Sequence, residues 1–348
     1  MKHMAELIID KTYRSKLSLR ETERAIKFIK DGFQANLARA LRLQRVSAPL
    51  FVRGGSGIND DLNGSERKVS FPIKHDNSRA EVVFSLAKWK RLVLADYEFR
   101  AGEGLYADMN AIRPDEDSLD NIHSVYVDQW DWEKIITKRQ RSLSFLRATV
   151  RSIYKAMKDT ERAVHSKYST LRPALPAAIT FIHAEDLAKA HPELDPRERE
   201  LRAAEKHGAV FIIGIGGALK DGKPHDGRAP DYDDWTTPTG GGRKGLNGDL
   251  FVWYQPLKIA LEISSMGIRV DRKALLKQLK MRNALARKEL FWHKRLLNKR
   301  LPLTIGGGIG QSRLCMLFLK KLHIGEVHAS VWPEDMRAKC SKAGIRLL

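Results

Sequence analysis

The sequence predicts an α+β fold in which an antiparallel β-sheet is flanked by helices. Segments with the composition of strands follow one another with mostly short connections, and the longest helical segments are gathered in stretches of their own. The 348 residues are 43% hydrophobic, which is enough for one substantial core, and no internal repeat or low-complexity segment divides them. We therefore expect a single domain over residues 1–348.

The first half of the chain is expected to begin with a long amphipathic helix. Ser18 and Glu21 have the spacing of a capping box, and apolar residues recur on one helical face as far as Leu41. The sequence then predicts, in order, a strand over 48–52, a loop over 53–65, strands over 69–73 and 81–85, a helix over 85–94 and an aromatic strand over 125–132.

The second half is expected to add helices over 133–170 and 185–207, which lie outside the sheet. An apolar run over 209–215 predicts a buried strand, and the stretch 218–248, rich in Gly, Asp and Pro, predicts a long loop that is either functional or disordered. Strands are expected over 250–253, 259–263 and 301–305. The last strand leads through a glycine-rich turn over 306–310 into an apolar helix over 312–319.

The formal net charge of +20 favours anionic partners such as nucleotides or nucleic acid. The densest stretch is 272–300, where eleven lysines and arginines accompany one acidic residue, Glu289, at a spacing that predicts an exposed helical hairpin. A solvated basic face is the favoured interpretation of this stretch, and a nucleic-acid site is the alternative.

Composition also excludes several classes of protein. The sequence contains no run of about 18 apolar residues, so no membrane-spanning helix is expected. The N-terminal stretch lacks the pattern of a secretory signal. Cys315 and Cys340 are too few for a disulfide framework or for a cysteine metal site. Together these features favour a cytoplasmic protein.

Polar side chains alternate along the predicted aromatic strand. Gln129, Asp131 and Glu133 are two residues apart, so they share one face of the strand, and Trp130 and Trp132 share the other. The polar face either lines a pocket or faces solvent, and the local pattern leaves both interpretations open.

Two carboxylates from different predicted strands are candidate metal ligands. Glu262 and Ser264 are expected to share one strand face, with Asp249 on a neighbouring strand. Carboxylate oxygens hold Mg²⁺ and bridge it to phosphates. The glycine-rich turn at 306–310 resembles a phosphate-binding loop, and Arg313 behind it favours anion binding, although the Lys-Ser/Thr ending of a P-loop is missing.

Several ordered segments resemble the three motifs of class II aminoacyl-tRNA synthetases. The first helix with Val46-Ser-Ala-Pro49 resembles motif 1, Arg113-Pro-Asp-Glu116 resembles motif 2, and Gly308-Ile-Gly-Gln-Ser-Arg313 resembles motif 3. Over nearly the whole chain the sequence is similar to the ammonia-dependent asparagine synthetase (aspartate–ammonia ligase) family. That resemblance rests on the strings AGEGLY, RPDED, HSVYVDQWDWE, APDYDDW, GLNGD, SSMGIRVD and IGGGIGQSRL.

The resemblance implies the catalytic fold of a class II synthetase and a homodimer built on motif 1. It also implies a reaction in which aspartate, ATP and ammonia give asparagine through β-aspartyl-AMP, with release of AMP and diphosphate. Arg113 and Arg313 would hold the ATP phosphates, Asp249 and Glu262 would hold Mg²⁺, and Asp60 would belong to the amino-acid pocket. Because ammonium is a cation at neutral pH, we further hypothesise that Asp60 binds it and that either Asp60 or the substrate phosphate accepts its proton. Other residues near the nucleotide would be Glu116, His123, Ser124, Val127 and Asp233. Other residues of the aspartate site would be Ser85, Lys90, Gln129, Asp131, Ser265 and Arg269.

Three positions depart from the synthetase motifs. Motif 2 usually separates its arginine and its acidic residue by one position, so either Asp115 or Glu116 contacts adenine. Val127 stands where the synthetases have a phenylalanine against adenine, and Ser312 stands where motif 3 has an aspartate. These departures concern the adenine contacts and leave the two phosphate-binding arginines in place.

An aspartyl- or asparaginyl-tRNA synthetase-like paralogue that binds tRNA is the alternative function. It would need an anticodon-binding domain, and 348 residues leave no room for one beside the catalytic core. A glutamine-hydrolysing synthetase would need an N-terminal cysteine nucleophile, whereas this chain begins with Met1 and Lys2. We therefore expect free ammonia as the nitrogen donor, with nucleic acid as an unfavoured partner.

Overall fold

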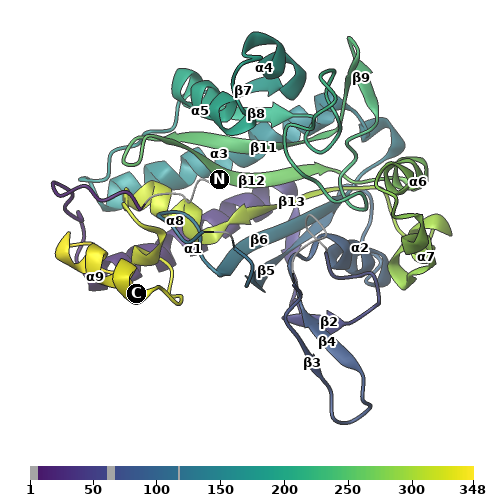
Figure 1. Cartoon of the computed structure of the whole chain (residues 1–348), viewed down its shortest axis with the longest axis horizontal. Helices are drawn as coiled ribbons and strands as arrows, with labels where there is room; N and C mark the ends of the chain where they lie inside the picture. Colours follow the sequence, from purple (N-terminus) through teal and green to yellow (C-terminus); the bar gives the residue numbers. More distant parts are fainter. Residues whose placement is uncertain (1–6, 61–66, 117) are drawn as a thin grey trace.

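The computed structural model describes residues 7–60, 67–116 and 118–348, and its centre is an eight-stranded sheet (Figure 1). In spatial order the strands are β1 (Leu43–Arg45), β5 (Gly104–Ile112), β6 (Tyr126–Ile135), β13 (Thr304–Gly310), β12 (Ile259–Ile268), β11 (Asn247–Tyr254), β8 (Ala209–Ile213) and β7 (Thr180–His183). The outermost pairs, β1 with β5 and β7 with β8, are parallel, and all other neighbours are antiparallel. This arrangement confirms the predicted fold class.

One face of the sheet is covered by long helices that form the main hydrophobic core. α1 (Leu19–Leu41), α3 (Leu143–Lys167) and α8 (Gln311–Leu319) pack there against Trp130 and Trp132, both fully buried. α1 begins at the predicted capping box, in which the side chains of Ser18 and Glu21 each accept a hydrogen bond from the other residue's backbone N–H. The short helix η3 (Ile324–Glu326) and α9 (Glu334–Lys342) extend this core near the C-terminus.

The opposite face carries helices only toward its two ends. α2 (Ala87–Asp96) packs against β5 and β6, whereas α4 (Ala184–Ala190) and α5 (Pro196–His207) pack near β7, β8 and β11. Between these helices, β6, β12 and β13 present side chains and glycine backbone to the cavity described below. The fold therefore leaves a polar strip exposed on one face of an otherwise buried sheet.

The remaining elements lie at the edges of the sheet. α6 (Arg272–Met281), η2 (Leu285–Glu289) and α7 (Phe291–Leu297) form the basic helical hairpin predicted over 272–300 and pack beside α2. β2 (Phe51–Arg53), β4 (Arg79–Val82) and β3 (Ser70–Pro72) form a small separate sheet. β9 (Pro238–Gly240) pairs with β10 (Arg243–Lys244) inside the long loop, and η1 (Lys138–Gln140) precedes α3. Within the described ranges, every helix is too short or too polar to span a lipid bilayer.

Several predicted boundaries are wrong. Residues 306–310, predicted as a glycine-rich turn, belong to β13, which inserts between β6 and β12. Glycine is unfavourable in strands, but here the neighbouring strands leave no room for a side chain, since a Cβ on Gly307 would lie 2.5 Å from the Met266 Cβ. The strand predicted over 48–52 begins only at Phe51, and the helix predicted from residue 133 begins only at Leu143. β1, β5 and β7 lie in segments for which no strand is predicted, and the loop predicted over 53–65 lies partly outside the described residues.

Candidate active site

A cavity of about 430 Å³ lies on the open face of the sheet, over β6, β12 and β13. Gln129 and Asp131 line it, so the polar face of β6 faces a pocket and not open solvent. All residues to which the resemblance assigns a role line this one cavity: Asp60, Ser85, Lys90, Arg113, Glu116, His123, Ser124, Val127, Gln129, Asp131, Asp233, Asp249, Glu262, Ser265, Arg269 and Arg313.

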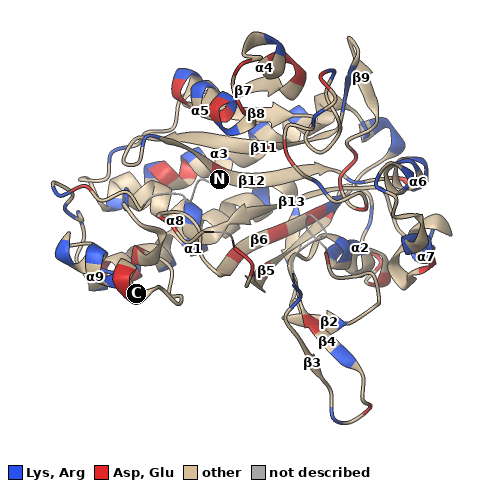
Figure 2. Ribbon diagram, in the orientation of Figure 1, with Lys and Arg blue, Asp and Glu red and all other residues tan. Residues whose placement is uncertain are grey.

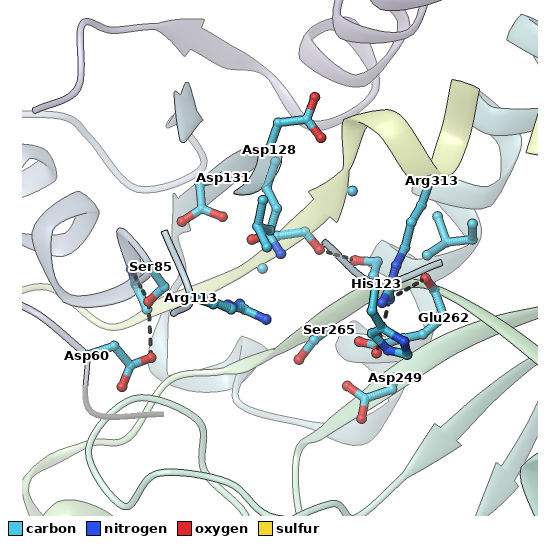
Figure 3. Close-up of a pocket in the computed structure, with 18 of the residues that line it drawn as sticks. Asp60, Ser85, Arg113, His123, Asp128, Asp131, Asp249, Glu262, Ser265 and Arg313 are labelled. Atoms are coloured by element: carbon cyan, nitrogen blue, oxygen red, sulfur yellow. Dashed lines mark hydrogen bonds and ion pairs between the residues drawn. The ribbon is translucent and has the colours of Figure 1, made fainter. Parts of the chain in front are cut away.

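The labelled side chains divide the cavity into two ends (Figure 3). Asp60, Ser85 and Asp131 lie together at one end. His123, Asp249, Glu262 and Arg313 lie together at the other, and Arg113 and Ser265 lie between the two groups. One end is thus lined by groups suited to an amino acid, and the other by an arginine and carboxylates suited to a polyphosphate, with a second arginine, Arg113, between them.

α2 carries Lys90 into the first end of the cavity. The Lys90 Nζ lies 3.1 Å from the Asp131 Oδ2 and donates to the backbone oxygen of Gly307 at 3.2 Å. Burial lowers the pKa of Lys90, and the negative charge of Asp131 opposes this effect. An ammonium group that is shielded from water in this way is well placed to bind a substrate carboxylate.

Asp60 and Ser85 complete the same end. The Ser85 hydroxyl donates to the Asp60 Oδ2 at 3.0 Å, and the backbone N–H of Leu86 donates to the Asp131 Oδ2 at 3.0 Å. Ser85 and Leu86, which directly precede α2, thereby fix two buried carboxylates at this end of the cavity. Carboxylates in such a position suit a cationic group of the substrate.

The two candidate phosphate-binding arginines come from different elements of the fold. Arg113 directly follows β5, and its buried Nε has no hydrogen-bond partner among the described residues. Arg313 lies in the first turn of α8, where its Nη1 donates to the backbone oxygen of Glu262 at 3.0 Å and to the Glu262 Oε2 at 3.4 Å. A buried guanidinium N–H without a partner is costly, so Arg113 is suited to an anion that enters the cavity.

An ion pair helps to decide which acidic residue of motif 2, Asp115 or Glu116, contacts the nucleotide. Asp115 accepts hydrogen bonds from the Arg67 backbone N–H at 2.6 Å and from the Arg67 Nε at 2.7 Å. Both residues line the cavity, but Glu116 has no ion-pair partner within the described ranges. Of the two residues that the sequence leaves open, Glu116 is therefore the better candidate for a nucleotide contact.

A β-bulge in β12 corrects the predicted strand face of Glu262. The pairing of β11 with β12 shifts by one residue, because Leu250 lies opposite Ser264 whereas Phe251 lies opposite Glu262, which leaves Ile263 unpaired. Glu262 consequently shares its face with Asp249 and Ser265 and not with Ser264. The bulge therefore turns both predicted metal ligands toward the same cavity.

Arg228 is a cavity residue that the sequence reasoning missed. Its Nη2 donates to the Asp249 Oδ1 at 2.5 Å, and its Nε lies 3.5 Å from the Asp233 Oδ2. Burial raises the pKa of Asp249 to about 7, Arg228 opposes this effect, and the negative charge of Glu262 adds to it. Arg228 lies one residue before the APDYDDW string, but an arginine in a polar loop gives no local signal of a buried ion pair.

Arg269 is held by carboxylates on both sides. The Glu133 Oε2 accepts hydrogen bonds from the Arg269 Nε and Nη2 at 3.0 Å each, and the Asp233 Oδ1 accepts one from the Arg269 Nη1 at 2.5 Å. Glu133 itself is fully buried and does not line the cavity. Of the three alternating polar residues of β6, two therefore face the cavity and the third orients an arginine that does.

Asp128 and Tyr232 also line the cavity without having been predicted. Asp128 contacts the start of α8, and the Tyr232 ring packs under the Arg269 guanidinium at 5.8 Å from its centroid. Burial strongly raises the pKa of Tyr232, so its phenol stays protonated. The APDYDDW string includes Tyr232, but its register in the loop is fixed only by the tertiary structure.

The comparison with known families gives a match over most of the chain. A family described as aspartate–ammonia ligase matches residues 20–344. An aspartate–ammonia ligase from Parabacteroides distasonis is 57% identical over 346 residues, which cover 99% of this chain and 100% of that protein. An aspartate–ammonia ligase from Clostridium perfringens is 58% identical over 346 residues, with the same coverage.

Solved structures of class II synthetases share the fold. The asparaginyl-tRNA synthetase of Pyrococcus horikoshii, complexed with asparaginyl-adenylate, aligns with a TM-score of 0.65 at 16% identity over 90% of this chain and 70% of that chain. The asparaginyl-tRNA synthetase of Entamoeba histolytica, also complexed with asparaginyl-adenylate, aligns with a TM-score of 0.64 at 15% identity over 89% of this chain and 66% of that chain. At these identities the likeness shows the fold alone. Because the family match and the relatives span nearly the whole chain, this protein belongs to the aspartate–ammonia ligase family, the ATP-dependent ligases that make asparagine.

Proposed function

We propose that the cavity makes asparagine in two steps through β-aspartyl-AMP. In the first step, an oxygen of the aspartate β-carboxylate attacks the α-phosphorus of ATP, and diphosphate leaves. In the second step, ammonia attacks the β-carbonyl carbon, loses a proton, and displaces AMP. The observation that carries this proposal is that Arg113, Arg313 and the Asp249–Glu262 pair line the same cavity as Lys90 and Asp131.

The nucleotide end supports adenylation by its charge. The Arg113 Nε, which has no hydrogen-bond partner among the residues described, and the guanidinium of Arg313 are two cationic donors for the phosphates. Charge that develops on phosphate in the transition state is stabilised by such fixed donors. Glu116, His123, Ser124 and Val127 line the adjoining wall, where they would contact the adenosine part. The His123 ring is oriented by Asp120, whose Oδ2 lies 2.8 Å from the His123 Nδ1.

The two carboxylates at this end fit a magnesium ion. Asp249 and Glu262 lie close enough for the charge of Glu262 to raise the pKa of Asp249, and a divalent cation would relieve that repulsion. In the described ranges no group of three or more His, Cys, Asp or Glu is arranged to hold a metal, so the candidate site has only these two carboxylates. A pair of carboxylates suits Mg²⁺, which takes one or two carboxylates and completes its shell with water and phosphate. Bound there, the ion would neutralise the phosphate charge of ATP.

The amino-acid end supports aspartate as the substrate. Gln129 and Asp131 would bind the α-ammonium, and Lys90, Arg269, Ser85 and Ser265 would hold the carboxylates. Asp233 lies beside Arg269 and orients it. Because two buried cations stand opposite buried carboxylates, an α-amino dicarboxylate satisfies both ends of this site better than a neutral amino acid does.

Asp60 is the candidate group for ammonium. Its side chain is 2% exposed and lies beside Ser85 at the end of the cavity away from the phosphate-binding residues. A buried carboxylate there would bind ammonium and accept a proton as the nitrogen attacks. Replacing Asp60 by Asn should raise the KM for ammonium and shift the pH optimum, whereas an unchanged ammonium KM would remove Asp60 from this role.

Isotope transfer tests the two-step route directly. Aspartate labelled with ¹⁸O in its β-carboxylate, incubated with ATP, Mg²⁺ and ammonium, should give asparagine, diphosphate and AMP that carries one labelled oxygen. Label in inorganic phosphate together with ADP would overturn the adenylate route and point to an acyl phosphate. The control omits ammonium. Adenylation alone should still incorporate diphosphate, added in labelled form, into ATP.

We also propose that the protein is a cytoplasmic homodimer with one catalytic domain. The dimer is supported by the resemblance of α1 and its following strand to motif 1 and by Leu50 and Phe51, which are exposed next to that segment. The reduced state of Cys315 and Cys340, both buried free thiols, is compatible with the cytoplasm. Sedimentation analysis showing a monomer at micromolar concentration would contradict the dimer.

A further inference from the structure

Half of the net charge of this chain is concentrated in one twelfth of its length. Residues 272–300 contribute eleven lysines and arginines and one acidic side chain, hence ten of the twenty net positive charges. Figure 2 shows these blue segments on α6 and α7, at the right edge of the view. Seven cations of this stretch are exposed and have neither an ion pair nor a side-chain hydrogen bond within the described ranges; Arg282 is exposed too, but it donates to the Gly216 backbone oxygen. We call these seven the basic surface: Arg272, Lys273, Lys277, Lys280, Lys288, Lys299 and Arg300.

Within the part of the chain that the structure describes, the acidic side chains near the basic surface do not neutralise it, because each has another partner. Asp96 pairs with Arg295, Glu289 pairs with Lys294, and Asp231 is shared by Lys88, Arg287 and His293. Asp271 caps α6 through the Ala274 backbone N–H. The seven cations therefore face solvent with their charge uncompensated, which destabilises the free protein by self-repulsion and favours a polyanionic partner.

The apolar faces of the two helices are already buried. Leu275 and Leu279 of α6 and Trp292 and Leu296 of α7 pack with Leu92 of α2 in one hydrophobic cluster. A helix that inserts into a lipid surface must offer its apolar face to the membrane, whereas most apolar side chains of these helices are buried and only Leu276, Met281, Leu285 and Phe291 of the stretch are exposed. The basic surface is therefore mainly polar, which favours nucleic acid over an anionic membrane.

An exposed aromatic side chain stands among the cations. Phe291 is 53% exposed, and the Arg295 guanidinium lies 5.9 Å from its ring centroid. Aromatic rings and guanidinium planes beside a cationic track are the features on which unpaired bases stack. A base-paired duplex would hide its base faces from Phe291, so this feature favours a single strand.

We propose that the basic surface binds single-stranded nucleic acid, with phosphates on the α6 lysines and a base on Phe291. None of the seven cations lines the catalytic cavity, so this function is separate from asparagine synthesis and does not depend on the proposed mechanism. Binding of this type is sequence-tolerant, depends steeply on salt and has dissociation constants of about 1 to 100 μM at physiological salt.

Fluorescence anisotropy with a labelled mixed-sequence 20-nucleotide RNA tests the proposal, using the full chain at several KCl concentrations. The test variant combines Lys273→Gln, Lys277→Gln and Lys280→Gln on α6. The control combines Lys189→Gln, Lys206→Gln and Lys342→Gln, which removes the same charge from exposed lysines on α4, α5 and α9. Those helices lie away from α6 and α7 in Figure 1. Asparagine synthesis and thermal melting of both variants establish that each is folded.

The α6 variant should bind RNA about tenfold more weakly or worse, and the slope of log affinity against log salt should fall by about 2, since each lost single-strand phosphate contact contributes about 0.7. The control should bind like the parent chain. Equal losses in the two variants, or no binding by the parent chain at 150 mM KCl, would overturn the proposal. A single-stranded DNA of the same sequence distinguishes the two sources of the ligand.

Phe291→Ala separates base stacking from charge. This substitution should weaken RNA binding about tenfold and leave the binding of inorganic polyphosphate, which has no bases, unchanged. An equal effect on both ligands, or no effect on RNA, would overturn the stacking contact and reduce the surface to an unselective anion binder. Vesicles with 30% phosphatidylserine are the last arm, and binding to them without binding to RNA would assign the surface to a membrane instead.

Discussion

Asp128 of β6 clamps Ser312 at the start of α8. The Asp128 Oδ1 accepts a hydrogen bond from the Ser312 backbone N–H at 3.0 Å, and the Asp128 Oδ2 accepts one from the Ser312 hydroxyl at 2.8 Å. The Lys30 Nζ of α1 lies 3.0 Å from the same Oδ2. Although burial raises the pKa of Asp128, the charge of Lys30 and the hydrogen bonds from Ser312 hold it below its usual value. Since Arg313 is the next residue, this clamp fixes the direction in which its guanidinium leaves the helix.

Asp128→Asn should therefore impair ATP use more than aspartate use. The amide has one acceptor oxygen where the carboxylate has two, so it cannot accept from Lys30, the Ser312 hydroxyl and the Ser312 backbone N–H together; α8 loses part of its anchor and Arg313 shifts. We expect kcat/KM for ATP to fall about 10- to 100-fold, because small misplacements of a phosphate-binding group cost that much. Steady-state kinetics measure the effect, and the control is Asp159→Asn in α3, a half-buried aspartate that also pairs with basic side chains but lies outside the cavity. An equal fall in kcat/KM for aspartate would argue against a positioning role.

Arg313→Lys should lower kcat about 100- to 1,000-fold. Lysine keeps the charge but loses the planar donor fork that a phosphate transition state requires. The matched control is Arg337→Lys on α9, which is exposed and should retain full activity. Rapid-quench measurement of AMP formation distinguishes this loss from slow product release. An Arg313→Lys variant with parental kcat would exclude the guanidinium from transition-state binding.

Gly308→Ala should block the amino-acid end of the cavity. A Cβ at this position would overlap the Gln129 Oε1 and would lie 2.7 Å from the Asp131 Oδ1. We expect the KM for aspartate to rise at least tenfold, while ATP binding measured by calorimetry stays within about twofold of the parent. The control is Gly32→Ala in α1, where a Cβ meets nothing within 4 Å and where alanine should stabilise the helix by up to about 1 kcal/mol. Parental aspartate KM in Gly308→Ala would show that aspartate binds elsewhere.

The pH dependence of stability should carry the signature of His323. This residue is fully buried, its Nδ1 accepts from the Gly325 backbone N–H at 3.0 Å, and burial lowers its pKa to about 4 from 6.5. A histidine with a lowered pKa is neutral in the folded state, so its stabilising effect is complete above pH 6.5 and is lost as the pH falls toward 4. The difference between the two pKa values corresponds to about 3 kcal/mol in the free energy of unfolding.

Urea unfolding at pH 7.5, 6.5, 5.5 and 4.5 measures this effect. His323→Gln should remove that part of the acid-induced loss of unfolding free energy. His75→Gln is the control, because His75 is exposed in the loop between β3 and β4, and it should show the pH profile of the parent chain. If the two variants had the same profile, the titration of His323 would not govern stability in this range.

Local patterns predicted the helices better than the strands. The capping box at Ser18 and the apolar period of α1 depend on residues within one helical turn, so the sequence alone locates that helix. β5 was not predicted, although its local pattern indicates a strand: Leu105, Ala107, Met109 and Ala111 alternate along the chain and are all buried. β13 was not, since its glycines are unfavourable in strands by local preference and are required only by the close approach of β6 and β12.

The sequence by itself determined the kinds of groups at the site, the order of the three motifs and the family to which the chain belongs. The tertiary structure alone decided how those groups face one another. The bulge that leaves Ile263 unpaired turns Glu262 toward Asp249, and a loop brings Arg228 between Asp249 and Asp233. Strand register and loop placement depend on contacts between residues far apart in the chain, and no short sequence period encodes such contacts.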